Sequence, residues 1–292
     1  MTVDDIDLLA SYWTIAGDTY PGAPSEVSPF PLRERAEAAA AAGWRGMGLV
    51  HADIVAQVER LGLREVKAIF ADNDVRHLEL EFVVDWHLDG ARREASDAMF
   101  RDLLDIGSEF GVEKIKLGGG VFEEGEPDLP RMREAFQVLC EKAAPHAIDL
   151  VVEFLPFASI DTIDRGLALV DGLPNTNGGL LVDIWHIARG GMTLDEIGKI
   201  PPGRLRAVEI NDADERVVGS LFEDSTDHRK LCGEGALGVP SFIQAVLDAG
   251  YRGYWGVEVI SARLRKLPLD VAARRAFETA IEQFERVRLP AA

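Results

Sequence analysis

Strand-like and helix-like segments alternate along the whole chain, and this alternation restricts the fold more than any other feature of the sequence. Short apolar runs predict strands at residues 8–15, 46–50, 77–84, 114–117, 150–154, 180–183, 205–210 and 254–259. Amphipathic stretches predict helices at residues 32–42, 54–61, 92–110, 131–144, 160–170, 193–199, 239–249 and 269–287. Because no linker rich in proline or serine divides these βα units, we predict a single α/β domain over residues 1–292, a (β/α)8 TIM barrel.

The composition narrows the class of partner. The 292 residues include 31 Lys and Arg against 50 Asp and Glu, a formal net charge of −19, so we expect neither nucleic acid nor an anionic membrane as a partner. Cys140 and Cys232 predict no disulfide framework and no thiolate metal site. The acidic start of the chain lacks the pattern of a secretory signal, and no apolar run approaches the ~18–20 residues of a membrane span. We therefore expect a cytoplasmic protein.

Four acidic residues stand at matching places in four successive strand-like segments. Glu153, Asp183, Glu209 and Glu258 each follow an apolar run of the kind expected for a strand buried on both faces. A buried carboxylate must be neutralised, paired or bound to a cation. Because the strands of a barrel end around one axis, we predict that all four bind one divalent metal ion, Mn²⁺ or Mg²⁺. The alternative is that one or two of them point outward, between strand and helix.

Other polar residues near the predicted strand ends extend this site. His186 lies three residues after Asp183 and can exchange a proton or bind a substrate hydroxyl, unless it only packs or caps a helix. Lys116, inside an apolar strand, indicates either an acidic partner or an anionic group of the substrate, unless its ammonium group reaches solvent. His51, after the second strand, and Glu81, within the third, are further candidates for binding substrate.

Two connections are long enough to cover the mouth of the barrel, at residues 118–130 and 211–238. Ordered loops of this length are usually functional, so we expect both to act as lids. The second contains Gly233-Glu234-Gly235 and carries Arg216 and Arg229, which either bind a phosphate group of the substrate or remain lid or surface charges.

The pattern as a whole resembles the xylose isomerase-like barrel superfamily of sugar isomerases and epimerases. The resemblance rests on Glu153, Asp183 and Glu258, on the Asp183-x-x-His186 spacing, and on Gly233-Glu234-Gly235. It implies a metal ion held at the ends of strands five to eight and a small sugar or polyol as substrate. Because members are often oligomeric, it also leaves a homo-oligomer open.

One residue departs from the family pattern. Glu209 stands where many relatives have a histidine. A glutamate still binds Mn²⁺ or Mg²⁺, but it adds negative charge and disfavours zinc relative to a site that contains a histidine. The endonuclease branch of the superfamily uses more histidines and a DNA-facing surface, so six histidines and a net charge of −19 disfavour it here.

The resemblance implies an isomerase or epimerase that acts on a small ketose or related sugar through an enediolate intermediate. Glu153 and Glu258 are then the acid and base on opposite faces of the substrate, and His186 holds a substrate oxygen. The alternative is a metal-dependent lyase or dehydratase with the same enolate chemistry, acting on a keto-sugar, a 3-keto glycoside or a dehydroshikimate-like substrate. A third interpretation is a non-catalytic sugar-binding barrel with weak or absent metal binding.

Overall fold

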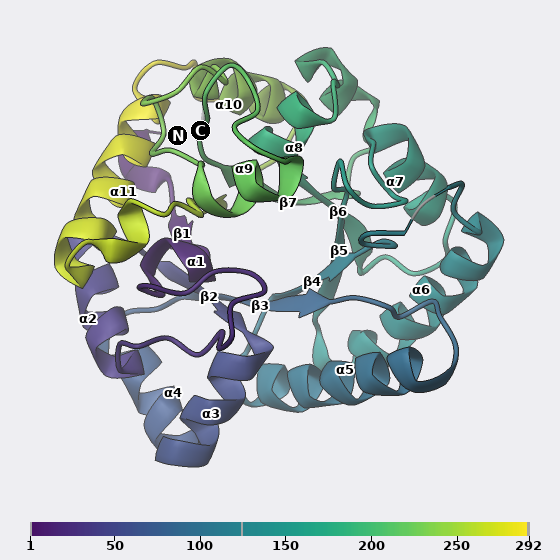
Figure 1. Ribbon diagram of the computed structural model, residues 1–292, viewed down its shortest axis with the longest axis horizontal. Coiled ribbons are helices and arrows are strands. Elements are labelled where there is room, and N and C mark those ends of the chain that lie inside the picture. The colour runs from purple at the N-terminus through teal and green to yellow at the C-terminus, as the bar shows by residue number, and fades with distance from the viewer. Residues whose placement is uncertain (1, 124, 291–292) are drawn as a thin grey trace.

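Eight parallel strands form a closed barrel in the computed structural model, which describes residues 2–123 and 125–290 (Figure 1). The strands are β1 (Leu8–Ala10), β2 (Gly46–Val50), β3 (His77–Val83), β4 (Lys114–Gly118), β5 (Asp149–Glu153), β6 (Gly178–Asp183), β7 (Leu205–Ile210) and β8 (Trp255–Val257). Each strand pairs with the next one in the chain, and β8 pairs with β1 to close the barrel. The predicted (β/α)8 barrel is confirmed.

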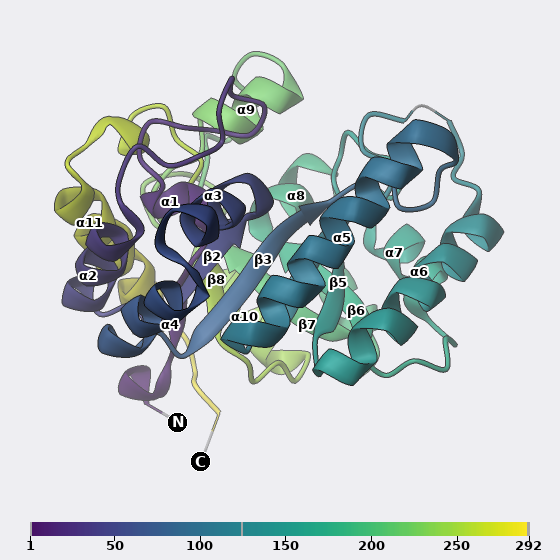
Figure 2. The ribbon, with the colours of Figure 1, turned by 90° about the horizontal axis from the view of Figure 1, so that it is seen from below.

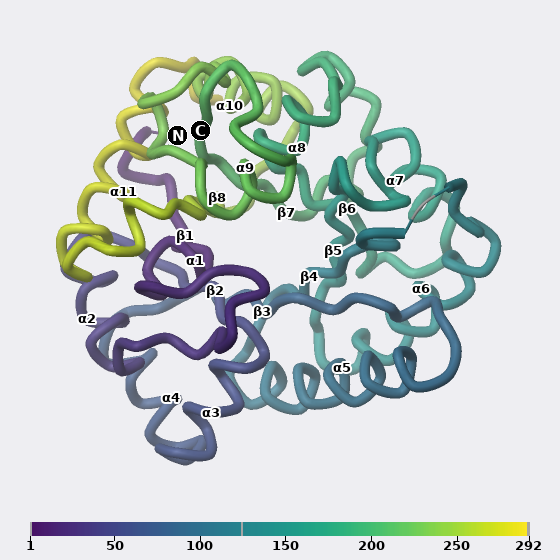
Figure 3. The backbone as a smooth tube through the Cα atoms, viewed as in Figure 1, coloured from purple at the N-terminus to yellow at the C-terminus, as the bar shows by residue number. Residues whose placement is uncertain are grey.

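Helices surround the barrel, and the tube view follows the chain once around its axis (Figures 2 and 3). The α-helices are α1 (Tyr12–Ile15), α2 (Leu32–Ala42), α3 (His51–Leu61), α4 (Leu63–Asp72), α5 (Gly90–Phe110), α6 (Leu129–Ala143), α7 (Ile163–Val170), α8 (Ile184–Arg189), α9 (Leu221–Asp227), α10 (Val239–Asp248) and α11 (Leu269–Phe284). The 3₁₀ helices are η1 (Val3–Asp5), η2 (Ala144–His146), η3 (Leu194–Lys199) and η4 (Leu264–Lys266). Within the described residues, no helix combines the length and the apolar character that crossing a membrane requires.

The main core lies between the strands and the helices. Trp44, which is 1% exposed, donates a hydrogen bond of 3.0 Å from its indole nitrogen to the carbonyl of Ala273 in α11. Phe284 of α11 packs edge-on against Trp255 of β8, with ring centroids 5.1 Å apart. Burying each of these large side chains contributes about 1.5–3 kcal/mol. These two contacts fix the last helix to β8 and to the segment just before β2.

A smaller apolar cluster inside the barrel determines where the acidic residues point. Val151, Leu181 and Ala207, on β5, β6 and β7, contact one another in the barrel interior. Side chains alternate between the two faces of a strand, so residues two positions later point the same way. Glu153, Asp183 and Glu209 stand two positions after these three residues and therefore also point inward, one layer nearer the mouth.

Several boundaries differ from the sequence prediction. Residues 8–15 form β1 and then α1 instead of one strand, because the chain turns at Ser11, whose carbonyl accepts a hydrogen bond of 3.0 Å from the amide of Thr14. Helix α4 begins immediately after Gly62, which ends α3 with a positive φ of 81°. Helix α9 forms within the predicted lid 211–238, because Ser220 and Glu223 cap its first turn reciprocally. Residue 124, in the predicted lid 118–130, lies outside the described residues.

Candidate functional site

The four predicted acidic residues meet at the carboxyl end of the barrel. Glu153 and Asp183 end β5 and β6, Glu209 is the next-to-last residue of β7, and Glu258 directly follows β8. One oxygen atom from each side chain can be chosen so that all four lie within 4.8 Å of one another, and all four residues are buried. We refer to these four residues as the carboxylate cluster. Such spacing allows a single ion to contact every member.

Two buried cations balance part of the charge of this cluster. Nη1 of Arg229 lies 2.8 Å from Oδ2 of Asp183 and 3.0 Å from Oε2 of Glu258. The ammonium group of Lys116 lies 2.5 Å from Oε1 of Glu209. It also lies 3.6 Å from the nearest carboxylate oxygens of two residues of β3, Glu79 and Glu81. With a third cation, Lys114 beside Glu79, six buried carboxylates face three buried cations.

The unbalanced negative charge appears in the carboxyl pKa values. Burial raises the pKa of Glu209 to about 8, with the charges of Glu153 and Asp183 adding to the effect and Lys116 opposing it. Burial, together with the charge of Glu209, also raises the pKa of Glu258 well above its ordinary value. A divalent cation bound here would offset this charge and keep the carboxylates ionised.

Two carboxylate oxygens in the cluster make no hydrogen bond of good geometry within the described part of the chain, although one of them, Oε1 of Glu153, lies 3.1 Å from Nε2 of His186. Oε1 of Glu153 and Oε2 of Glu209 are buried without a hydrogen-bond partner among the described residues. The other oxygen of Glu209, Oε1, accepts hydrogen bonds of 2.5 Å from Oγ of Ser11 and from Nζ of Lys116. Because both donors hold the same oxygen, Oε2 of Glu209 remains without a hydrogen-bond partner among the described residues. The residues present therefore fit a metal ion.

Helix α8 places His186 beside the cluster. Oδ1 of Asp183 accepts a hydrogen bond of 2.5 Å from the amide of Trp185 and so caps the helix that starts directly after β6. His186 is 1% exposed, and its Nε2 lies 3.1 Å from Oε1 of Glu153. Glu153, Asp183 and His186 form a second group with ligand atoms within 4.8 Å of one another.

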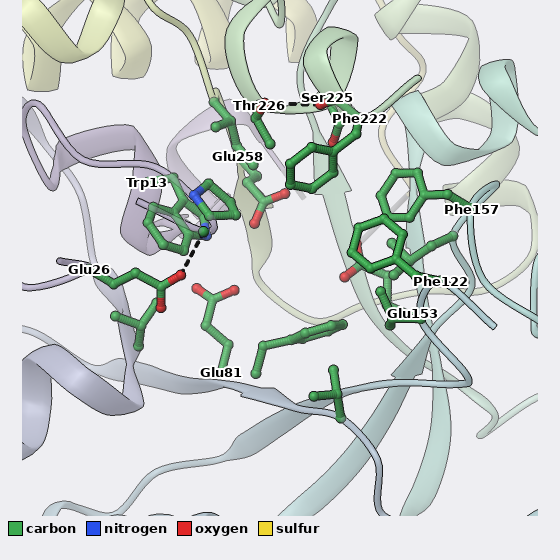
Figure 4. Close-up of a pocket in the computed structure, with 18 of the residues that line it drawn as sticks. Trp13, Glu26, Glu81, Phe122, Glu153, Phe157, Phe222, Ser225, Thr226 and Glu258 are labelled. Atoms are coloured by element: carbon green, nitrogen blue, oxygen red, sulfur yellow. Dashed lines mark hydrogen bonds between the residues drawn. The ribbon is translucent and has the colours of Figure 1, made fainter. Parts of the chain in front are cut away.

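A cavity of about 380 Å³ opens over the cluster (Figure 4). Of the residues predicted for the site, Glu153, Glu258, His186, Glu81 and His51 line it. The imidazole of His51 also contacts Asp102, with Nε2 3.0 Å from Oδ2. The figure shows the carboxylates of Glu81, Glu153 and Glu258 directed into the open space.

Three of the other predicted residues are buried outside the cavity lining, one is exposed, and one lines the cavity. Asp183, Glu209 and Lys116 are buried and lie outside the cavity lining, so Lys116 acts on the site through Glu209. Arg216 is exposed on the loop after β7 and also lies outside the lining. Arg229 is 2% exposed and lines the cavity floor, a position that its place in a long loop did not indicate.

The Gly233-Glu234-Gly235 turn fixes the segment that carries Arg229. The turn wraps around the carboxylate of Asp212, whose oxygens accept hydrogen bonds of 3.0 Å from the amide of Gly233 and 2.9 Å from the amide of Leu237. Asp212 and Lys230 also exchange backbone hydrogen bonds of 3.0 and 2.7 Å, which hold the residue next to Arg229. A Cβ atom at position 235 would lie 2.3 Å from the carbonyl oxygen of Ala213 and 2.4 Å from Oδ1 of Asp212.

We expect Gly235→Ala to lower the free energy of unfolding by about 1–3 kcal/mol, because the added methyl group displaces backbone that has no room to move. Urea unfolding measures the change. Gly198→Ala is the matched control, since a Cβ there meets no atom within 4 Å, and its effect should stay within about 0.5 kcal/mol. Equal unfolding midpoints for the two variants would show that the turn tolerates a side chain at position 235.

Comparison with known proteins supplies relatives of two activities. The inosose isomerase of Halalkalibacterium halodurans is 22% identical over 226 residues, which cover 75% of this chain and 79% of that protein. The 3-dehydroshikimate dehydratase of Pseudomonas aeruginosa is 26% identical over 266 residues, 88% of this chain but 40% of that protein, so the chain spans less than half of its length. A crystal structure described as IOLI protein with a binding zinc atom has a TM-score of 0.84 at 15% identity, covering 96% of this chain and 99% of that one.

A family model described as xylose isomerase-like TIM barrel matches residues 36–286. The match begins within α2 and ends just after α11, so it includes strands β2 to β8 and the whole carboxylate cluster. The Asp183-x-x-His186 spacing and the Gly233-Glu234-Gly235 turn also lie within it. The chain therefore belongs to the xylose isomerase-like TIM barrel family, as the resemblance predicted.

Proposed function

We propose that this protein is a divalent-metal-dependent enzyme that isomerises or epimerises a small ketose or related sugar. The observation that carries the proposal is the convergence of four buried carboxylates, two of them with unused oxygens, beneath and along the floor of an open cavity. Similarity to a protein named inosose isomerase supports the reaction class. The same four carboxylates argue against a non-catalytic sugar-binding barrel with weak or absent metal binding.

Glu153, Asp183, Glu209 and Glu258 would hold the metal ion. A ligand set of oxygen atoms alone favours Mn²⁺ or Mg²⁺, whereas the structurally similar IOLI protein was crystallised with zinc. When bound, the ion supplies a positive charge that stabilises the negative charge developing on substrate oxygens. Lys116 and Ser11 would orient Glu209 toward the ion.

Glu153 and Glu258 would move the proton. They come from β5 and from the segment after β8, and both carboxylates point into the same cavity (Figure 4). One would take the proton from the carbon beside the substrate carbonyl, forming the enediolate, and the other would return a proton from its own side. His186, beside Glu153, would hold a substrate oxygen, while Glu81 and His51 would bind hydroxyl groups.

Elimination is the second candidate reaction. The 3-dehydroshikimate dehydratase of Pseudomonas aeruginosa aligns with 88% of this chain. The same carboxylates would remove a proton beside a carbonyl, after which a group on the next carbon would leave instead of a proton returning. Two measurements on candidate ketoses and keto-acids in D₂O separate the reactions. Deuterium incorporated beside the carbonyl, detected by NMR, indicates isomerisation or epimerisation. An unsaturated product, detected by its ultraviolet absorption, indicates a lyase. Neither signal with any member of the panel would count against both.

We expect the protein to bind about one Mn²⁺ per chain, and Glu209→Gln to weaken that binding at least about tenfold, since the variant loses one ionised ligand. Isothermal titration calorimetry measures both values, and elemental analysis of the purified protein identifies the native ion. Glu285→Gln is the control, because it removes an exposed carboxylate directly after α11. This variant should bind Mn²⁺ as tightly as the unmodified protein. Unchanged affinity in Glu209→Gln would remove this residue from the ligand set.

A further inference from the structure

Three aromatic side chains from three connections meet on one side of the cavity. Phe122 follows β4, Phe157 follows β5, and Phe222 belongs to α9, after β7. The rings of Phe122 and Phe157 stack with centroids 5.4 Å apart and an angle of 21° between their planes. Phe222 meets them edge-on, at 5.4 and 6.0 Å. Figure 4 shows these three rings, which we term the aromatic wall, across the cavity from Trp13.

Specific backbone and side-chain contacts hold the aromatic wall in place. The amide of Phe122 donates a hydrogen bond of 2.9 Å to the carbonyl of Phe157, and Val121 pairs with Ala158, so the connections after β4 and β5 are joined. Helix α9, which carries Phe222, is anchored by Asp224. Its Oδ2 accepts hydrogen bonds of 2.9 Å from Nε1 of Trp185 and 2.8 Å from Nε of Arg189.

The aromatic wall nevertheless faces solvent. Phe122 is 62% exposed and Phe222 is 37% exposed, although both are large apolar residues. Phe122 also adopts a φ of 58°, a left-handed conformation that non-glycine residues rarely adopt. Exposed apolar side chains that are gathered at the mouth of a cavity indicate contact with a ligand, whereas core residues would be covered by the protein itself.

The cavity lining has two chemically different parts. The floor presents charged groups, among them Glu153, Arg229 and Glu258. Most of the remaining lining is apolar and includes, besides the aromatic wall, Trp13, Met99 and Ile260. A small free sugar can place a C–H face against an aromatic ring, but hydroxyl groups at the edge of its ring would have no hydrogen-bond partner along the rest of this apolar lining. A ligand with a polar head and a flat apolar tail matches both parts.

We propose that the substrate is a carbonyl-bearing polyol with a flat apolar substituent, such as an aryl group, held between the aromatic wall and Trp13. The proposal rests on the proposed function in one respect, because it assigns the polyol head to the charged floor. A cavity of about 380 Å³ lies within the range that accommodates a ligand of this size.

The test uses pairs of unreactive probes that differ only in the substituent: the phenyl and methyl β-D-glycosides of glucose, galactose and xylose. Calorimetric titration of the Mn²⁺-loaded protein should show, for at least one pair, that the phenyl glycoside binds about 10- to 100-fold more tightly, since burial of a phenyl ring contributes a factor of this size. Phe122→Ala and Phe222→Ala should each reduce this preference severalfold. Val138→Ala, which truncates a side chain that is 42% exposed elsewhere on the surface, should leave it unchanged.

Equal affinities within every pair, absence of binding by all six probes, or a preference that survives in both phenylalanine variants would overturn the proposal. The results also distinguish a failure of this substrate class from a failure of the proposed reaction. A protein that prefers phenyl glycosides but exchanges no proton on any ketose or keto-acid would keep the apolar subsite and lose the reaction. Proton exchange on small ketoses, combined with equal affinities within every pair, would keep the reaction and overturn the substrate class.

Discussion

Glu258→Gln is expected to lower the rate of proton exchange on the substrate by at least about 100-fold. The carboxylate of Glu258 lies in the cavity floor, with Oε2 3.0 Å from Nη1 of Arg229. A glutamine has the same size and still accepts a hydrogen bond from Arg229, but it cannot take up a proton. The loss should therefore appear mainly in kcat, measured by NMR as incorporation of deuterium beside the carbonyl.

Metal content and thermal stability must be measured on the same samples, because Glu258 also belongs to the carboxylate cluster. A variant that keeps its Mn²⁺ and its unfolding temperature but loses exchange has lost a proton carrier. Glu153→Gln should show a loss of similar size if the two residues act in sequence on opposite faces of the substrate. Near-normal exchange by Glu258→Gln would assign the proton transfer to another group.

Lys116→Met is expected to lower the free energy of unfolding by about 3–5 kcal/mol, because it leaves buried carboxylates without their cation. Burial alone would lower the pKa of Lys116, but the charges of Glu209, Glu81 and Glu79 raise it well above its ordinary value, so the side chain is an ammonium group at neutral pH. Methionine fills similar space without the charge. Urea unfolding, monitored by tryptophan fluorescence, gives the free energy.

A double-mutant cycle identifies the partner. If Glu209 is the main partner of Lys116, adding Glu209→Gln to Lys116→Met should recover at least about 1 kcal/mol, because the uncompensated charge is removed as well. Lys199→Met is the control: its side chain is 47% exposed and paired with Asp164 and Glu196, so its loss should cost about 1 kcal/mol or less. Equal losses for the two lysine variants would mean that Lys116 contributes no more than a surface ion pair.

The Lys116–Glu209 pair offers a physical reason why a glutamate can stand where the family resemblance implies a histidine. A glutamate in place of a histidine brings an extra negative charge into a group that already holds three carboxylates. The nearby ammonium of Lys116 offsets that charge and, together with Ser11, leaves one oxygen of Glu209 free. Zinc binding should therefore be weaker than at a site that has a histidine in this place, as expected for a ligand set without thiolate or imidazole among the four residues.

The sequence by itself determined the barrel and the position of the acidic residues at the ends of their strands. Alternating apolar strands and amphipathic helices leave few ways to bury their apolar faces, and the closed barrel is the one that eight βα units adopt. Within a strand, the two-residue period places Glu153, Asp183 and Glu209 on the same face as Val151, Leu181 and Ala207. The contact of those three apolar residues inside the barrel then shows that this face is the inner one. The type of each element and the residues that share one face of a strand are properties of short segments, so the local sequence pattern predicts them.

Only the tertiary structure decided what surrounds the carboxylate cluster. Ser11 and Glu209 are 198 residues apart, and Lys116 and Glu209 are 93 residues apart, yet each pair is in contact because the barrel closes. Arg229 and the aromatic wall lie in connections whose paths depend on contacts such as Asp212 with the Gly233-Glu234-Gly235 turn and Asp224 with Trp185. Loop sequences have no periodic pattern from which the direction of a side chain can be predicted. That direction depends on the elements that each loop contacts once the barrel has formed.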